Sequence, residues 1–244
     1  MSLDTLTREQ QIRYKGHISL CEIDLPGQKA LGNARVLMIG AGGLGSPVGL
    51  YLAAAGVGTI GIIDADTVSL SNLQRQIMHG TPDIGAPKVE SAREAMTRIN
   101  PEVRTVLYPF FLTGENAVEL IGEYDIVVDC TDNLEARLLI NDTCVSLGKP
   151  FVYGAVSRFS GQIFTHTPGN ATYRDIFDTT APTEELPCVI DGVMNTVVGV
   201  IGTLQATEVV KWIVKTGDLL TNRMLLFDAI TMTFNTFEIN SIDR

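Results

Sequence analysis

Several features are scarce in this sequence of 244 residues, and each scarcity excludes a class of protein. Basic residues are few: 18 Lys and Arg stand against 28 Asp and Glu, a net charge of -10, which argues against a nucleic-acid scaffold. No uncharged apolar run reaches the roughly 18 residues that a membrane span needs. The opening segment MSLDTLTREQQIRYK is too polar for a signal peptide. We therefore expect a cytoplasmic protein that binds neither nucleic acid nor membrane.

Cysteine is also scarce, and the spacing of the cysteines does not indicate a disulfide framework or a metal site. The four cysteines are far apart and form no C-x-x-C pair, so neither a disulfide framework nor a four-thiolate zinc site is indicated. Cys130 ends an apolar strand pattern and Cys144 lies in a helical pattern, so both are expected to be small core residues. Cys188 lies in a polar loop before a Gly-rich apolar stretch, and its pattern alone assigns it no role.

What is present is a regular alternation of strand and helix patterns over the first two thirds of the chain. Such alternation predicts an α/β fold: a doubly wound, Rossmann-like, mainly parallel sheet with helices on both faces. We treat residues 1–244 as a single domain with a nucleotide-binding half, about 30–155, and a C-terminal half, about 156–244. The expected strands are 36–39, 59–63, 103–108, 125–129 and 150–154, and the expected helices are 7–14, 44–55, 85–99, 114–121 and 133–147.

Beyond residue 156 the pattern changes to one that favours antiparallel strands at the C-terminal end. Strands are predicted at 161–167, 225–228 and 233–239, with a polar loop over 168–187. A loop of this length without apolar period is typical of a functional segment. The predicted helix at 192–214 is apolar on nearly every face, which fits burial against a second subunit or inside the monomer equally well.

The stretch VLMIGAGGLGSPVGLYLAAAGVGTIGIIDAD, residues 36–66, indicates a nucleotide site. Gly40, Gly42 and Gly45 follow a buried strand at G-x-G-x-x-G spacing and open a helix, whose N–H groups and dipole attract phosphate. Asp64 ends the next strand, about 20 residues later, where a carboxylate accepts hydrogen bonds from ribose hydroxyls. The alternative is that Gly43 and Gly45 serve only close packing of helix on strand.

The residues after this acid distinguish an ATP site from a site for a nicotinamide dinucleotide. The segment DADTVSLSNLQRQIMHGTPDIGAPKVESA brings Asn72, Arg75, Gln76 and Lys88 close behind Asp64. Cations and carboxamides supply charge-assisted donors to the oxygens of a triphosphate, whereas the nicotinamide half of a dinucleotide has no such need. The pattern therefore favours ATP.

A pair of acids follows the fourth predicted strand, in DIVVDCTDN. Asp129 and Asp132 stand at the carboxyl edge of the sheet, where a carboxylate can hold Mg²⁺ against phosphate oxygens. These residues predict a magnesium-dependent reaction of ATP.

The chain resembles the ThiF/MoeB/HesA adenylyltransferases, relatives of the ubiquitin-activating enzymes. The resemblance covers nearly the whole chain and is carried by RYKGHISL, GQKAL, GAGGLGSP, DADTVSLSNLQRQ, PKVESA, INP, DCTDN and GVIGTLQATEVVK. It implies adenylation of the C-terminal Gly-Gly carboxylate of a small ubiquitin-like sulfur-carrier protein, with release of pyrophosphate. A thiocarboxylate for thiamin, molybdopterin or a related pathway is then formed.

Carried over residue by residue, the resemblance assigns Asp64 to the ribose and Asp132 to Mg²⁺. Arg75, Lys88 and Asp132 are expected to be catalytic. No general base is needed, because a carboxylate is already ionised near neutral pH. The full predicted ATP-binding set is Gly40, Gly42, Gly43, Gly45, Asp64, Asn72, Arg75, Gln76, Lys88, Asp132 and Asn133.

Three further features bear on the resemblance. Cys188 matches a cysteine that takes part in covalent sulfur transfer in some relatives and not in others. The first cysteine pair of a structural zinc site would fall at Thr172 and Asp175, so no zinc is expected. An N-terminal arginine that serves the neighbouring subunit's ATP is replaced by Gly16, for which Arg13 or Lys15 would have to substitute.

The resemblance also implies a homodimer. Two other functions stay open at this point: adenylation of a different carboxylate, on a peptide or a tRNA-linked adenosine, and a non-catalytic scaffold of the same fold. The sequence does not identify the carrier, the pathway or the sulfur donor.

Overall fold

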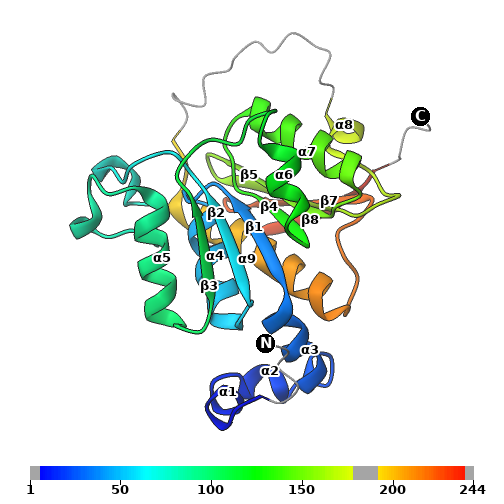
Figure 1. Cartoon of the computed structure of the whole chain (residues 1–244). Coiled ribbons are helices and arrows are strands. Elements are labelled where there is room, and N and C mark those ends of the chain that lie inside the picture. Colours follow the sequence, from blue (N-terminus) through cyan, green and yellow to red (C-terminus); the bar gives the residue numbers. More distant parts are fainter. Residues whose placement is uncertain (1–5, 178–191, 240–244) are drawn as a thin grey trace.

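The computed structural model describes residues 6–177 and 192–239, which are built around one sheet of eight strands (Figure 1). The strand order is β3-β2-β1-β4-β5-β6-β7-β8, with parallel pairing from β3 through β5 and antiparallel pairing from β5 to β8. The predicted mainly parallel sheet with antiparallel strands at its C-terminal end is confirmed. The strands are β1 Arg35–Ile39, β2 Thr59–Ile63, β3 Arg104–Tyr108, β4 Ile126–Asp129, β5 Phe151–Ser157, β6 Ser160–His166, β7 Arg223–Asp228 and β8 Thr233–Glu238.

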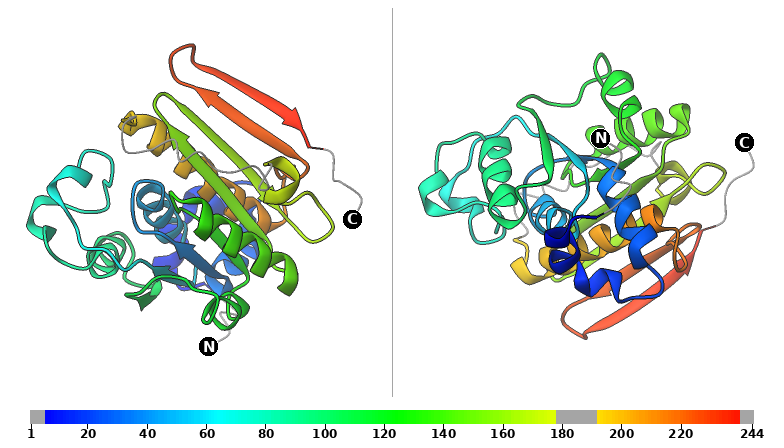
Figure 2. Two further views of the ribbon diagram at one scale, coloured as in Figure 1. Left: turned by 90° about the horizontal axis from the view of Figure 1, so that it is seen from above. Right: turned by 60° about the horizontal axis from the view of Figure 1, so that its bottom comes forward.

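Helices cover both faces of the parallel part, as the doubly wound prediction requires (Figure 1). One face carries α4 Gly45–Ala55, α5 Lys88–Ile99 and α9 Asn195–Val214. The other carries α6 Ala117–Gly122, α7 Leu134–Leu147 and α8 Tyr173–Ile176. Figure 2 shows the β7–β8 hairpin extending the sheet beyond β6, at the edge opposite to β3.

The apolar strand patterns arise because the parallel strands are buried on both sides. In β1, Val36 and Met38 join the core beneath α4 and α9, whereas Leu37 and Ile39 join the core beneath α6 and α7. Successive side chains of a strand point to opposite faces, so a strand between two helical layers must be apolar throughout. This is why β1, β2 and β4 are recognisable from the sequence.

Residues 6–33 hold three helices where one was predicted. The helix predicted at 7–14 is α1 Arg8–Arg13, which begins with a capping box between Thr7 and Gln10. It is followed by α2 Lys15–Ile18 and α3 Asp24–Asn33. The α3 sequence DLPGQKALGN contains a proline and two glycines, which weaken helix propensity, and the helix forms in packing contact with α9. Tertiary contact therefore overrode the local signal.

The segment predicted as a polar loop at 168–187 is described as far as residue 177, and it contains the short helix α8. Thr172 is the residue before this helix: its hydroxyl donates to Asp175 Oδ2 at 2.7 Å, and its backbone N–H donates to the same oxygen at 2.8 Å. Thr172 and Asp175 are the two positions at which a zinc-binding pair would fall. Among the described residues no cluster of three or more His, Cys, Asp or Glu could hold a metal ion.

The long apolar helix α9 is a core element. By length and composition it would be able to cross a membrane, but half of its most apolar window is buried inside the protein, as in the core helices of soluble proteins that meet the same criterion. It packs against α4, β5 and β6. Burial within the monomer therefore explains part of its apolar composition, and the homodimer stays a prediction that depends on the family resemblance.

Both cysteines predicted to be core residues are buried. Cys130 follows β4 and Cys144 lies in α7, and burial raises the pKa of both thiols. These thiols are therefore protonated at neutral pH, which makes them poor nucleophiles.

Candidate functional site

A cavity of about 710 Å³ opens where the parallel strands end. Its walls include the ends of β1, β2 and β5, the segment after β4, the turn before α4 and the first turns of α5 and α7. β1 lies between β2 and β4, so the connections from neighbouring strands leave toward opposite faces at this point. Ligands of doubly wound sheets bind at this reversal of strand order.

The glycine turn forms the floor between β1 and α4. Gly40 has a φ of +100°, a conformation that favours glycine, and Gly42 and Gly43 line the cavity. Gly45 does not line it; a Cβ built there would lie 2.2 Å from the Gly40 carbonyl oxygen. For Gly45 the packing interpretation therefore accounts for the residue, since only glycine allows α4 to begin so close to β1.

We expect Gly45→Ala to lower the free energy of unfolding by about 2–4 kcal/mol, because the added methyl group overlaps backbone that cannot move aside easily. Gly122→Ala is the matched control, since a Cβ at Gly122 meets nothing within 4 Å. Urea unfolding of both variants measures the difference. Equal midpoints would contradict the packing role of Gly45.

Asp64 stands at the end of β2 and faces the cavity. Its Oδ2 accepts the Ala41 N–H at 2.8 Å and its Oδ1 accepts the Asp66 N–H at 2.8 Å. Each carboxylate oxygen has a further lone pair, so the side chain is both anchored to the glycine turn and able to accept from a ribose. The predicted ribose role of Asp64 stays a prediction that this geometry fits.

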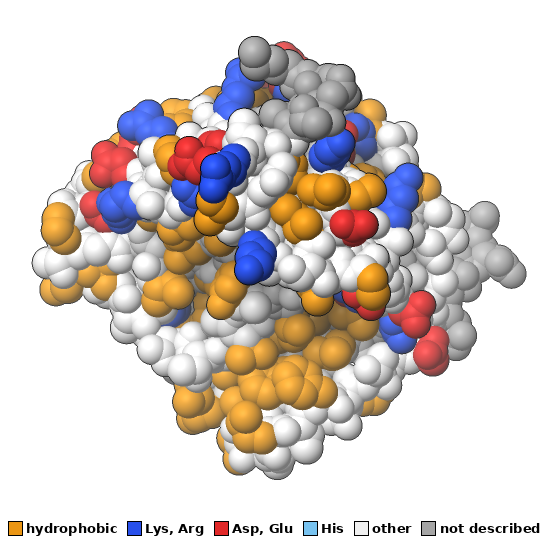
Figure 3. All heavy atoms as spheres, turned by 90° about the horizontal axis from the view of Figure 1, so that it is seen from below, with side chains coloured by type: hydrophobic (Ala, Val, Ile, Leu, Met, Phe, Trp, Pro, Cys, Tyr) orange, Lys and Arg blue, Asp and Glu red, His pale blue; other side chains and the backbone are white. Residues whose placement is uncertain are grey.

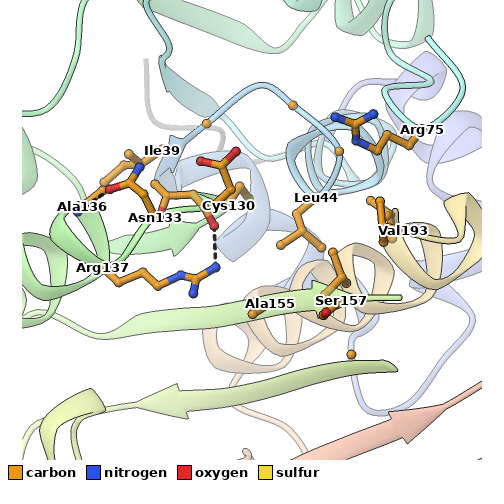
Figure 4. Close-up of a pocket in the computed structure, with 18 of the residues that line it drawn as sticks. Ile39, Leu44, Arg75, Cys130, Asn133, Ala136, Arg137, Ala155, Ser157 and Val193 are labelled. Atoms are coloured by element: carbon orange, nitrogen blue, oxygen red, sulfur yellow. Dashed lines mark hydrogen bonds between the residues drawn. The ribbon is translucent and has the colours of Figure 1, made fainter. Parts of the chain in front are cut away.

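Arg75 and Gln76 reach the cavity, and Asn72 does not. Figure 4 shows Arg75 beside the start of α4, at the end of the cavity away from Asn133 and Arg137. Gln76 is buried, and its Oε1 has no hydrogen-bond partner among the described residues. The Asn72 carbonyl accepts the N–H groups of Arg75 and Gln76, so in this structure Asn72 shapes the turn that presents them.

Lys88 begins α5 with its side chain almost fully buried in the cavity wall. Its Nζ donates to Asp66 Oδ2 at 2.7 Å, and its backbone N–H donates to the Asp66 carbonyl. The Lys88 side chain is 7% exposed and that of Asp66 is 59% exposed. Asp66 holds the ammonium at the cavity, a pairing that the sequence analysis missed although DAD and PKVE mark both residues.

Asp132 and Asn133 line the cavity after β4, as the predicted site requires. Asn133 caps α7 by accepting the Ala136 N–H at 2.9 Å. Asp132 is exposed at the cavity mouth. Mg²⁺ usually takes one or two carboxylates together with water and phosphate oxygens, and the exposed Asp132 carboxylate can supply one of them.

Asp129 is not available to a metal in the cavity, contrary to the role suggested for it at the strand end. It is 1% exposed, and its Oδ1 accepts the hydroxyl and N–H of Thr131 at 2.7 and 2.9 Å. Burial raises its pKa, an effect that the neighbouring Arg137 charge opposes. The side chain at this strand end points into the core because strand residues alternate between faces.

Arg137 is a cavity residue that sequence reasoning missed. Its Nη2 donates to the Thr131 carbonyl at 3.1 Å (Figure 4). Its guanidinium lies 5.5 Å from the centroid of the Tyr153 ring. It comes one helical turn after Asn133, so the i, i+4 spacing in NLEAR was the available signal. The cavity also continues beneath the antiparallel strands, where its lining includes Ser157, Ser160, Gly161, Val193, Phe227 and Asp228.

Two further expectations concern Cys188 and the N-terminal helices. Cys188 lies outside the described residues, so its predicted sulfur-transfer role stays a prediction. Gly16 lies on α2, and neither Arg13 nor Lys15 is among the residues that line the cavity. Arg13 instead donates from Nη1 to the Ile99 carbonyl at 3.0 Å.

Comparison with known proteins gives a family and several relatives. Residues 14–243 match the ThiF family. The probable adenylyltransferase/sulfurtransferase MoeZ of Mycobacterium tuberculosis is 44% identical over 240 residues, which cover 96% of this chain and 61% of the relative. The probable molybdopterin-synthase adenylyltransferase of Porphyra purpurea is 42% identical over 239 residues, which cover 96% of this chain and 62% of the relative.

A solved structure of E. coli MccB with ATP superposes with a TM-score of 0.79 at 23% identity, over 87% of this chain and 65% of that chain. At this identity the likeness shows the fold. The chain spans about three fifths of the length of the two curated relatives named here.

Proposed function

The chain belongs to the ThiF family, and from this premise we propose that it is an adenylyltransferase that activates a small ubiquitin-like sulfur-carrier protein with ATP. The group activated is the carrier's C-terminal Gly-Gly carboxylate. Relatives named for molybdopterin synthase and for combined adenylyl and sulfur transfer favour a carrier of the molybdopterin type over one of the thiamin type.

One observation carries the proposal: the residues suited to each part of ATP line the same cavity. They are the glycine turn, an acid placed to bind ribose, two cations placed to bind phosphates and an exposed carboxylate. Gly42, Asp64, Arg75, Lys88 and Asp132 all line it, although they come from separate parts of the chain. A volume of about 710 Å³ suits a nucleotide with part of a second substrate. A scaffold of the same fold has no need for this set.

The proposed reaction is an in-line displacement at the α-phosphorus of ATP. A carboxylate oxygen of the carrier forms a bond to that phosphorus, the bond to the bridging oxygen of the β-phosphate breaks, and pyrophosphate leaves with its electron pair. Both reactants are anions, so positioning and charge neutralisation supply most of the catalysis. Arg75 and Lys88 supply positive charge at the cavity wall, and no proton has to be removed from the attacking carboxylate.

Asp132 would hold Mg²⁺ at the cavity mouth. The bound ion supplies charge neutralisation to phosphate oxygens. Within the protein, Asn133 fixes the first turn of α7 and thereby the position of the adjacent Asp132.

The carrier's tail would enter under the antiparallel strands, where the cavity is lined by residues of the C-terminal half. Small side chains at Ser157, Ser160 and Gly161 leave room for a chain of two glycines. Nearby, the β7–β8 hairpin exposes Ile230, Met232, Phe234 and Phe237. Seen from below, the molecule also carries a broad area of hydrophobic side chains (Figure 3). Exposed apolar surface of this kind is typical of protein–protein contacts.

The test is ATP–pyrophosphate exchange with Mg²⁺, run with and without carriers that end in Gly-Gly. We expect exchange to depend on the carrier and to fall to background when its last two glycines are removed, because the shortened tail no longer reaches the α-phosphate.

The other outcomes separate the competing functions. Exchange stimulated by a short peptide and not by any carrier would indicate a different carboxylate substrate. ATP binding without exchange under any of these conditions would contradict adenylation and favour a scaffold.

A further inference from the structure

A buried histidine lies directly behind the glycine turn, on the side away from the cavity. His79 is 6% exposed, and its Nε2 lies 2.7 Å from the Ala41 carbonyl oxygen. Its Nδ1 lies 2.8 Å from the hydroxyl oxygen of Ser91, which is 2.9 Å from Asp83 Oδ2. The chain Asp83, Ser91, His79 and Ala41 therefore ends on the peptide group of the glycine turn.

The proton on this ring is assigned by its partners. A carbonyl oxygen only accepts, so Nε2 must carry a proton and donate to Ala41. The Gly80 N–H donates to Asp83 at 2.7 Å and lowers the pKa of Asp83, which is therefore ionised. Burial lowers the pKa of His79, an effect reinforced by Lys88 and opposed by the hydrogen bond to Ala41 and by the charges of Asp83 and Asp64. The Ser91 hydroxyl has one proton and donates it to Asp83 Oδ2, so the proton on Nε2 is fixed by the Ala41 carbonyl and not by Ser91.

Both ends of Ala41 are held in this way. Its N–H donates to Asp64 and its carbonyl accepts from His79. The Ala41–Gly42 peptide is trans, so its carbonyl and its N–H point in opposite directions. With the carbonyl turned toward His79, the N–H of Gly42 is turned away from it, and no group in residues 6–177 or 192–239 accepts from that N–H.

The same histidine contacts or belongs to each of the three segments whose residues are proposed to bind the phosphates of ATP. It contacts the glycine turn through Ala41, and it lies in the 75–80 segment that carries Arg75 and Gln76. Through Ser91 it contacts α5, where Lys88 lies one turn earlier. Loss of the ring would free all three segments to move relative to one another.

We propose that His79 is a positioning residue for the triphosphate: by holding the Ala41 carbonyl, it directs the Gly42 N–H toward the phosphates of ATP. This role rests on the proposed function, because it requires a nucleotide in the cavity. His79 touches no substrate. It acts through the orientation of one peptide group and through the packing of the 75–80 segment on α5.

The test compares the affinities of ATP and adenosine by isothermal titration calorimetry. His79→Leu removes the donor and keeps a side chain of similar size. We expect it to weaken ATP binding about tenfold or more, because a misdirected N–H no longer meets the phosphate charge. Adenosine binding is expected to stay within about twofold, since adenosine has no phosphates and is held at Asp64.

Two variants separate positioning from a general loss of structure. His79→Gln keeps an N–H donor near the place of Nε2 and should restore most of the ATP affinity. His166→Leu is the matched control: His166 is also buried, and its Nδ1 lies 3.0 Å from the Ala171 carbonyl, outside the cavity. It should lower the melting temperature and leave both affinities unchanged. If His79→Leu does not fold, Ser91→Ala provides the same comparison with a smaller expected loss of about threefold for ATP.

Equal weakening of ATP and adenosine in the His79 variants, or unchanged ATP binding in folded protein, would overturn the positioning role while leaving the proposed function intact. A wild-type protein that binds no ATP would overturn both. Binding is measured without the carrier, so a failure to find the correct carrier does not affect this test.

Discussion

Replacing Asp132 with alanine is expected to lower Mg²⁺-dependent ATP–pyrophosphate exchange by at least about a hundredfold, the usual effect of removing one group that stabilises transition-state charge. The side chain is exposed at the cavity mouth, and the structure gives it no hydrogen bond or ion pair within the described residues. The fold should therefore be unaffected, with a change in unfolding free energy within about 0.5 kcal/mol.

The matched control is Glu135→Ala. Glu135 is an exposed acid in the first turn of the same helix, and it does not line the cavity. Exchange by this variant should equal that of the wild type. A dependence of the Asp132 defect on Mg²⁺ concentration would add support, whereas unchanged exchange by Asp132→Ala in folded protein would remove Asp132 from the magnesium site.

Replacing Lys88 with methionine should have an effect of similar size, a loss of about 10²–10³-fold in kcat for exchange. Asp66 holds the Lys88 ammonium at the cavity, and the aliphatic part of the Lys88 side chain is buried in the cavity wall. The position of the positive charge is therefore fixed. Methionine keeps the apolar stem and removes the charge. Asp66 is largely exposed, so water can solvate its side chain after the change, and stability should fall little.

Lys149→Met is the control, because it also removes a lysine ammonium that donates hydrogen bonds. The Lys149 ammonium donates to the carbonyls of Gly122 and Tyr124, away from the cavity. This variant should lose some stability and keep its exchange activity. Steady-state exchange and thermal melting of both variants give the comparison, and normal kcat in Lys88→Met would exclude a catalytic cation at this position.

Much of the parallel half could be predicted because its signals are local. The strand from Arg35 to Ile39 is buried on both faces, so its composition alone distinguishes it from a surface strand. The glycine turn and the acid at the end of β2 belong to one strand, turn, helix and strand unit with a recognisable spacing. For these elements the sequence motif includes both partners of the contact.

The differences arise where contact partners are distant in sequence. The short helices α3 and α8 have weak local signals, and α3 is stabilised by packing on α9. Gly45 and Asn72 belong to the motifs, yet one serves the packing of α4 on β1 and the other shapes a turn. A motif identifies residues that act together, but it does not say which of them face the ligand.

Three sequence motifs are sufficient to indicate the fold class and a reaction of ATP: the glycine turn, the DTVSLSNLQRQ segment and the DCTDN strand end. Their signals depend on backbone geometry and charge over short spans. The contacts that complete the site could come only from the folded chain. Asp66 faces Lys88 across 22 residues, and His79 holds Ala41 across 38 residues. Such pairings depend on how helices pack on the sheet, which no local pattern encodes.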